Sequence, residues 1–93
     1  MYIKRTLSLA AAMLILFGCG VANDVTVCTD APQSQWLDQS DFKTTLQAKG
    51  YSINEFKVTD GSCYEIYGTD KDNNKVEIYF NPVDGSVVKQ EAH

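Results

Sequence analysis

The C-terminal half of the chain alternates between apolar and polar residues with a period of two, which constrains the fold more than any other feature. Four such segments follow one another: YSINEFKVT (51–59), SCYEIYGTD (62–70), KVEIYF (75–80) and SVVKQ (86–90). The residues between them, DG, DKDNN and NPVDG, are typical of the turns that join antiparallel strands. We therefore predict an antiparallel sheet of about four strands.

One helix is predicted before the strands, in the segment WLDQSDFKTTLQAKGY (36–51). Asp38 suits the N-cap position, Asp41 stands three residues later as in a capping box, and Gly50 supplies a left-handed stop. Phe42 and Leu46 lie one turn apart and form a narrow apolar stripe, which suits a helix that packs on a sheet. The fold class is therefore predicted to be α+β, with an N-terminal helix on the sheet.

The strand register follows from the first loop. If this loop has the three residues 60–62, Phe56 shares a face with Ile66, and the same parity pairs Ile66 with Ile78. The helix-covered face is then predicted to carry Phe56, Val58, Tyr64, Ile66, Val76, Ile78 and Phe80. The opposite face carries Lys57, Cys63, Glu65, Tyr67, Glu77 and Tyr79, with Tyr67 opposite Glu77 and Glu65 opposite Tyr79.

The N-terminus has the pattern of a secretory signal, with Lys4 and Arg5 before an apolar run that ends at Phe17. Cleavage after Ala22 predicts a signal peptide over 1–22; the alternative is cleavage after residue 18 with lipidation of Cys19. The apolar run is too short for a transmembrane span. Residues 23–35 are expected to form an extended arm, and 36–93 the folded domain.

Two cysteines remain after the predicted signal peptide and Cys19. Cleavage after Ala22 leaves 71 of the 93 residues, a size at which one core is marginally stable. Because an exported chain meets an oxidising compartment, Cys28 and Cys63 are predicted to form a disulfide. In the chain-entropy model, closing this loop contributes about 3 to 4 kcal/mol.

Charge excludes two classes of partner. The predicted exported chain has six lysines against 12 acidic residues, a net charge of −6. Binding to nucleic acid or adhesion to an anionic membrane requires the opposite sign.

Three patterns are candidate sites of chemistry: the Cys63 thiol, a zinc site and a calcium loop. Cys63 lacks a nearby base, since the only histidine is His93 at a C-terminus expected to be frayed. The same single histidine, with no closely spaced cysteines, argues against zinc. Asp70, Asp72 and Asn74 resemble the start of a calcium loop, but Lys75 stands where the EF-hand glycine belongs, so a polar hairpin tip is favoured. No catalytic residue, metal or cofactor is predicted.

The face opposite the helix allows two further interpretations. Glu65 and Glu77 would be an acid and base pair in an enzyme, but an open sheet face is expected to leave both carboxylates solvated, with unraised pKa values. Tyrosine is common at protein interfaces, so this face is a candidate contact surface for a partner or a second copy of the chain. Its candidate residues are Lys57, Glu65, Tyr67, Glu77 and Tyr79.

The segment LQAKGYSINEFKVTDGSCYEIYGTDKDNNKVEIYFNPVDGSVV (46–88) resembles the PepSY domain of small exported bacterial proteins. The resemblance is carried by Gly50-Tyr51, CYEIY (63–67), VEIYF (76–80) and NPVDG (81–85), and the lead-in CTDAPQSQWL (28–37) is also similar. It implies that 36–93 is a PepSY-like domain, with a helix on an antiparallel sheet and no catalytic residues. PepSY domains occur in metallopeptidase propeptides, where they are associated with inhibition or folding assistance.

The resemblance and the residues together predict a non-enzymatic binding module that modulates a peptidase or another cell-envelope protein. Its expected location is periplasmic or secreted. The alternative is a structural or assembly factor of the envelope, held at the outer membrane through lipidated Cys19. A ligand- or metal-binding enzyme subunit is a third hypothesis.

Overall fold

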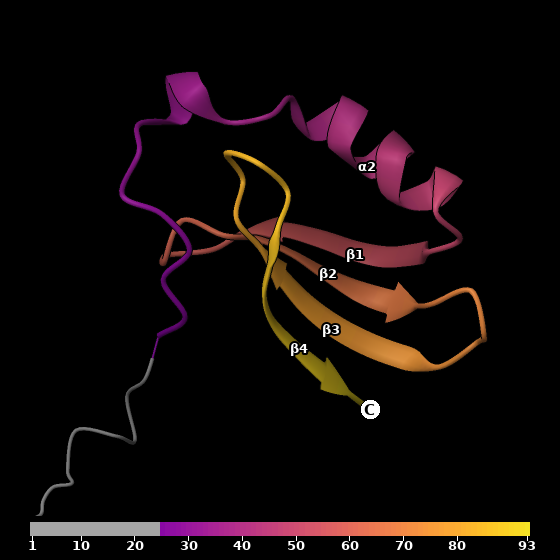
Figure 1. Cartoon of the computed structure of the whole chain (residues 1–93). Helices are drawn as coiled ribbons and strands as arrows, with labels where there is room; N and C mark the ends of the chain where they lie inside the picture. Colours follow the sequence, from indigo (N-terminus) through magenta and orange to yellow (C-terminus); the bar gives the residue numbers. More distant parts are fainter. Residues whose placement is uncertain (1–24) are drawn as a thin grey trace, which may run out of the picture.

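The computed structural model describes residues 25–93, and these form one helix on one face of a four-stranded antiparallel sheet (Figure 1). The helix α2 covers Gln39–Ala48, and the strands are β1 (Ser52–Val58), β2 (Tyr64–Thr69), β3 (Lys75–Phe80) and β4 (Val87–Ala92). The strands lie in the sheet in chain order, so β1 and β4 are the edges. The predicted α+β fold is confirmed. The expected signal peptide and Cys19 lie outside the described residues.

Local sequence sets both ends of α2. The Asp38 carboxylate accepts a hydrogen bond from the backbone N–H of Asp41 at 3.0 Å, which satisfies one free donor of the first turn. Gly50 ends the helix with a φ of 103°, a conformation that side chains rarely adopt. In the part of the chain that the structure describes, no helix has the length and apolar character needed to cross a membrane.

The predicted register is correct at every pair. Phe56 lies opposite Ile66, and Ile66 lies opposite Ile78. The backbone N–H of Thr59 donates to the Cys63 carbonyl, so the loop between these two residues has the expected three residues, 60–62. The alternation of apolar and polar residues in the sequence therefore predicts correctly which face of the sheet each of these side chains occupies.

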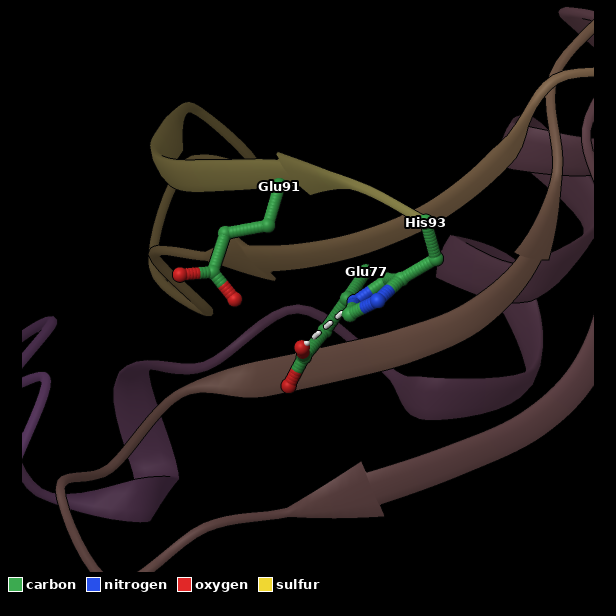
Figure 2. Close-up of side chains that lie close together, drawn as sticks. All are labelled: Glu77, Glu91 and His93. Atoms are coloured by element: carbon green, nitrogen blue, oxygen red, sulfur yellow. Dashed lines mark hydrogen bonds and ion pairs between the residues drawn. The ribbon is translucent and has the colours of Figure 1, made fainter.

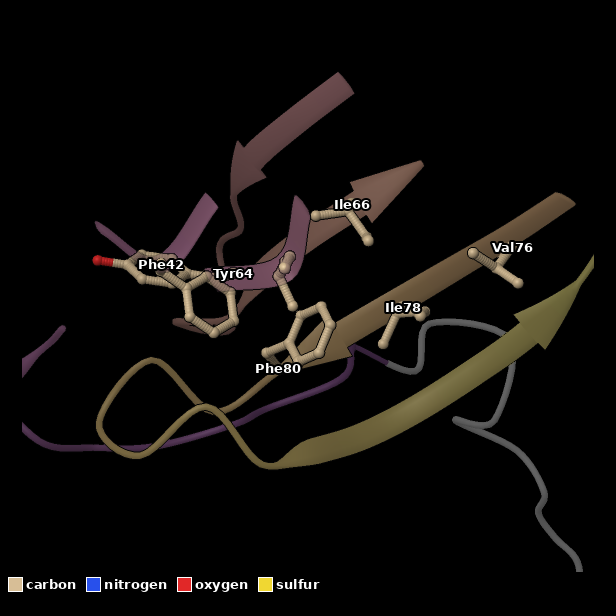
Figure 3. Packing of buried hydrophobic residues seen from close by; sticks show 7 residues of the cluster. Phe42, Tyr64, Ile66, Val76, Ile78 and Phe80 are labelled. Atoms are coloured by element: carbon tan, nitrogen blue, oxygen red, sulfur yellow. The ribbon is translucent and has the colours of Figure 1, made fainter. Parts of the chain in front are cut away.

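The core lies between α2 and the sheet (Figure 3). Its buried members are Phe42, Leu46, Tyr64, Ile66, Val76, Ile78 and Phe80. Phe56 is only partly buried, and Val58 is 42% exposed, because both lie on the edge strand β1. Val58 is therefore on the predicted face but outside the core. The Tyr64 hydroxyl donates to the Leu37 carbonyl at 2.6 Å, which ties the start of the helix to β2.

The N-terminal arm is fastened to the loop between β1 and β2. A disulfide joins Cys28 to Cys63, as predicted, and the Cys28 N–H donates to the Gly61 carbonyl at 3.0 Å. Only glycine fits at position 61, because a Cβ would lie 1.9 Å from the Thr26 carbonyl oxygen. Further along, Gln33–Gln35 form a 3₁₀ turn within a segment expected to be extended.

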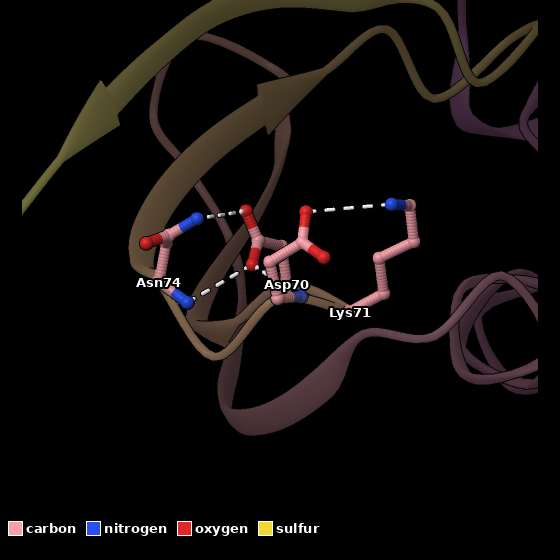
Figure 4. Close-up of polar contacts among 4 residues, drawn as sticks. Asp70, Lys71 and Asn74 are labelled. Carbon is pink, nitrogen blue, oxygen red and sulfur yellow. Dashed lines mark hydrogen bonds and ion pairs between the residues drawn. The ribbon is translucent and has the colours of Figure 1, made fainter.

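The loop between β2 and β3 is a polar hairpin tip (Figure 4). The Asp70 carboxylate accepts hydrogen bonds from the backbone N–H groups of Asp72 and Asn74 and from the Asn74 side chain. These bonds, with that from the Asn74 backbone the strongest, hold the pKa of Asp70 below its ordinary value. The carboxylate thus stabilises the turn itself.

Candidate functional site

The sheet face that α2 does not cover carries alternating tyrosines and glutamates. We call Lys57, Glu65, Tyr67, Glu77 and Tyr79 the tyrosine face. Glu65 lies opposite Lys57 on β1 and Tyr79 on β3, while Glu77 lies opposite Tyr67. Each glutamate on this face therefore has an aromatic cross-strand neighbour, and the predicted arrangement of these four side chains is correct.

The expectation that both carboxylates would be solvated is wrong. Glu65 is 4% exposed and Glu77 is 7% exposed, as little as core residues. Glu65 lines a hollow with Val25 and Thr26 of the N-terminal arm, so the arm and the large tyrosine rings exclude water that an open sheet face would admit. The arm that helps to bury Glu65 is far from it in the sequence, and an alternating pattern gives no sign of this contact.

Burial and hydrogen bonds separate the pKa values of the two glutamates. Burial raises the pKa of Glu65, and a hydrogen bond shared with Glu77 raises it further. The pKa of Glu77 falls to about 2, first because of the hydrogen bond from Glu65 and also because Tyr79 and His93 hydrogen-bond the carboxylate. Of the two glutamates, Glu65 is thus the one that binds a proton more readily, while Glu77 ionises more readily.

The exposed part of the face is aromatic and cationic. Lys57 Nζ lies 5.3 Å from the centre of the Tyr67 ring, and Lys89 Nζ lies 5.7 Å from that of Tyr79. Burial and then a hydrogen bond to Glu77 raise the pKa of Tyr79. For Tyr67, the bond to Glu77 is the first cause of a raised pKa. Both rings therefore stay protonated and present a neutral, partly exposed surface.

His93 and Glu91, which the sequence analysis did not assign to any site, join this face from β4. The His93 N–H donates to the Lys75 carbonyl at 2.9 Å, so the expected fraying of this end is wrong. His93 Nε2 lies 3.0 Å from Glu77 Oε1 (Figure 2). The signal in the sequence was the spacing of Lys89, Glu91 and His93, which continues the alternation beyond the predicted strand end at residue 90.

The two cysteines in the described residues carry no free thiol, since both belong to the disulfide. Cys63 is fully buried beside the arm. Cys63 therefore has a structural role, and it cannot act as a nucleophile while the disulfide is intact.

Fold and site together define a small, disulfide-linked α+β domain with an aromatic surface and no exposed thiol among residues 25–93. The sequence profile of the peptidase propeptide and YPEB domain family matches residues 6–91. The chain therefore belongs to the PepSY family, as the resemblance indicated. Searches of the curated proteins and of the solved structures gave no significant match.

Membership of this family sets the general character of the protein. PepSY domains are propeptide-like or regulatory modules, and they are generally non-catalytic. They are typically extracellular or periplasmic.

Proposed function

We propose that the chain is an exported, non-enzymatic binding module. It inhibits a peptidase or another cell-envelope protein, or it assists the folding of one. The observation that carries the proposal is the family match over residues 6–91. The disulfide supports it independently, because such bonds persist in oxidising compartments outside the cytosol.

The tyrosine face is the proposed contact surface. Glu65 and Glu77 are its buried members, and Glu77 accepts a hydrogen bond from the Tyr79 hydroxyl at 2.9 Å, so the groups that meet a partner are Tyr67, Tyr79 and Lys57. Rigid tyrosine rings bring a large contact area at a small cost in conformational entropy. The hydrogen bond to Glu77 orders the Tyr79 ring before a partner binds, which suits this surface to binding.

The outer edge of β4 offers a second contact beside this face. All six of its residues are exposed, and α2 lies towards the other edge of the sheet (Figure 1). Its first residues, Val87 and Val88, expose apolar side chains. An extended segment of the peptidase would pair with this edge through main-chain hydrogen bonds.

Pull-down from envelope extracts and a peptidase assay with the purified protein test this function. We expect a peptidase to co-purify and its activity or yield to change. Tyr67→Ala should weaken capture about tenfold or more, as loss of a tyrosine at an interface centre does, and Val88→Lys should weaken strand pairing.

Lys71→Ala is the matched control, since Lys71 is exposed on the hairpin tip away from both surfaces. Circular dichroism of each variant must match the parent. A protein that captures no envelope partner and leaves proteolysis unchanged would contradict the proposal.

The alternative function, a structural or assembly factor anchored in the outer membrane, depends on Cys19. Its support is the sequence LFGC (16–19), which is similar to a lipobox. Intact-mass measurement of the protein isolated from cells separates the two: an acylated Cys19 at the N-terminus favours the anchored factor, while an N-terminus at Asn23 favours the secreted or periplasmic module.

A further inference from the structure

Three potential metal ligands from two adjacent strands meet at one end of the tyrosine face (Figure 2). Glu77 on β3 lies directly opposite Glu91 on β4, and His93 follows Glu91 by two residues. The ligand atoms of the three side chains lie within 4.8 Å of one another. We propose that Glu77, Glu91 and His93 bind a divalent zinc ion.

Two of the three ligands are already held in place. Glu77 is buried, and its Oε2 accepts a hydrogen bond from the Tyr79 hydroxyl at 2.9 Å, which leaves Oε1 facing His93. The backbone of His93 is fixed by its bond to the Lys75 carbonyl. Metal ligands are usually oriented by such outer hydrogen bonds, so most of the ordering cost is met before an ion binds.

The ligand types select the ion. One imidazole and two carboxylates suit zinc, whereas calcium and magnesium take oxygen ligands alone and need more of them. Metals that prefer thiolate find no ligand here, because Cys28 and Cys63 form the disulfide.

The geometry requires one small movement. A tetrahedral zinc ion with bonds of about 2.1 Å holds its ligand atoms about 3.4 Å apart. Glu91 is exposed and its ion pair with Lys89 is a weak surface contact, so its side chain is free to close the remaining distance. Three protein ligands leave the fourth position to water or to a ligand from a partner.

Calorimetric titration of the chelator-treated protein, prepared without a histidine tag, tests the site. We expect one zinc ion per chain, with calcium and magnesium giving no saturable heat. His93→Ala and Glu91→Gln should each weaken binding about tenfold or more; both residues are exposed, so the fold should survive. Tyr79→Phe, which removes only the outer hydrogen bond, should weaken it about tenfold.

Glu55→Gln is the matched control, since Glu55 is an exposed acid on β1 next to Lys57. Its zinc affinity should equal that of the parent. Absence of saturable zinc binding would overturn the proposal, and so would equal losses in Glu55→Gln and Glu91→Gln, because these would show diffuse binding to surface carboxylates. Peptidase capture is measured separately, so failure of one proposal leaves the other intact.

Discussion

Both faces of this sheet bury some of their side chains, but by different means. The helix-covered face excludes water mainly with apolar side chains, as at Ile66 and Ile78, which are fully buried. The tyrosine face buries Glu65 and Glu77 under aromatic rings and meets the cost with hydrogen bonds. The stability of the helix-covered face depends on the packing of its side chains. That of the tyrosine face depends on the protonation of Glu65 and Glu77.

Because of this difference, the two faces are expected to differ in their sensitivity to pH. An apolar core tolerates changes of pH, whereas a buried carboxyl pair responds to them. The stability of a binding surface that contains such a pair therefore depends on pH, whereas that of the core does not.

Truncating the apolar face should have the largest effect. Phe80 is 3% exposed and packs edge-on against Phe42 with ring centres 5.0 Å apart. We expect Phe80→Ala to lower the free energy of unfolding by about 4 to 5 kcal/mol, measured by urea denaturation with Trp36 fluorescence. Val58→Ala, on the same face but exposed, should cost less than about 1 kcal/mol. Equal costs would mean that the helix does not define the core.

Opening the disulfide should have the next largest effect. The bond closes a separation of 35 residues and secures the arm beside Glu65. Cys28→Ser should lower the free energy of unfolding by about 3 to 4 kcal/mol. Thermal melting in non-reducing buffer measures the loss, and reduction of the parent should reproduce it. An unchanged melting temperature would show that the arm adds nothing to stability.

Neutralising the two glutamates one at a time should give opposite results. At pH 7, Glu77→Gln removes an acceptor of charge-assisted hydrogen bonds and should cost about 1 to 2 kcal/mol. Glu65→Gln keeps the shape of a group that resists ionisation, so the melting temperature should stay equal or rise. A larger loss in Glu65→Gln than in Glu77→Gln would contradict our conclusion that Glu65 binds a proton more readily.

The smallest net effect is expected from pH alone, because the pKa shifts of the two glutamates have opposite directions. The pKa of Glu77 is about 2 in the folded protein against an ordinary 4.5, so its stabilisation is present above 4.5 and is lost as the pH falls towards 2. Glu65 has a raised pKa, so its contribution is full below the ordinary value and is lost as the pH rises through the folded value. Melting curves of Glu77→Gln should converge on the parent in acid, and those of Glu65→Gln should diverge from it upwards with increasing pH.

The sequence was sufficient for the fold and insufficient for the state of the site. Alternation and loop length determine register, so every cross-strand pair from Phe56 to Ile78 was predictable. The burial of Glu65 was not, because it depends on the arm and on neighbouring strands. The predicted end of the last strand at residue 90 fell two residues short of Ala92, since pairing with β3 extends it. That extension is what brings His93 to Glu77.

The crosslinked arm and His93 lie at opposite ends of the sheet. Cys28 is attached at the turn between β1 and β2, while His93 bonds to Lys75 at the far turn between β2 and β3. If the arm is attached to a surface, the end of the sheet that carries His93 therefore faces away from that surface. For immobilisation, a handle placed before the arm leaves the histidine end accessible, whereas one fused after His93 would crowd it.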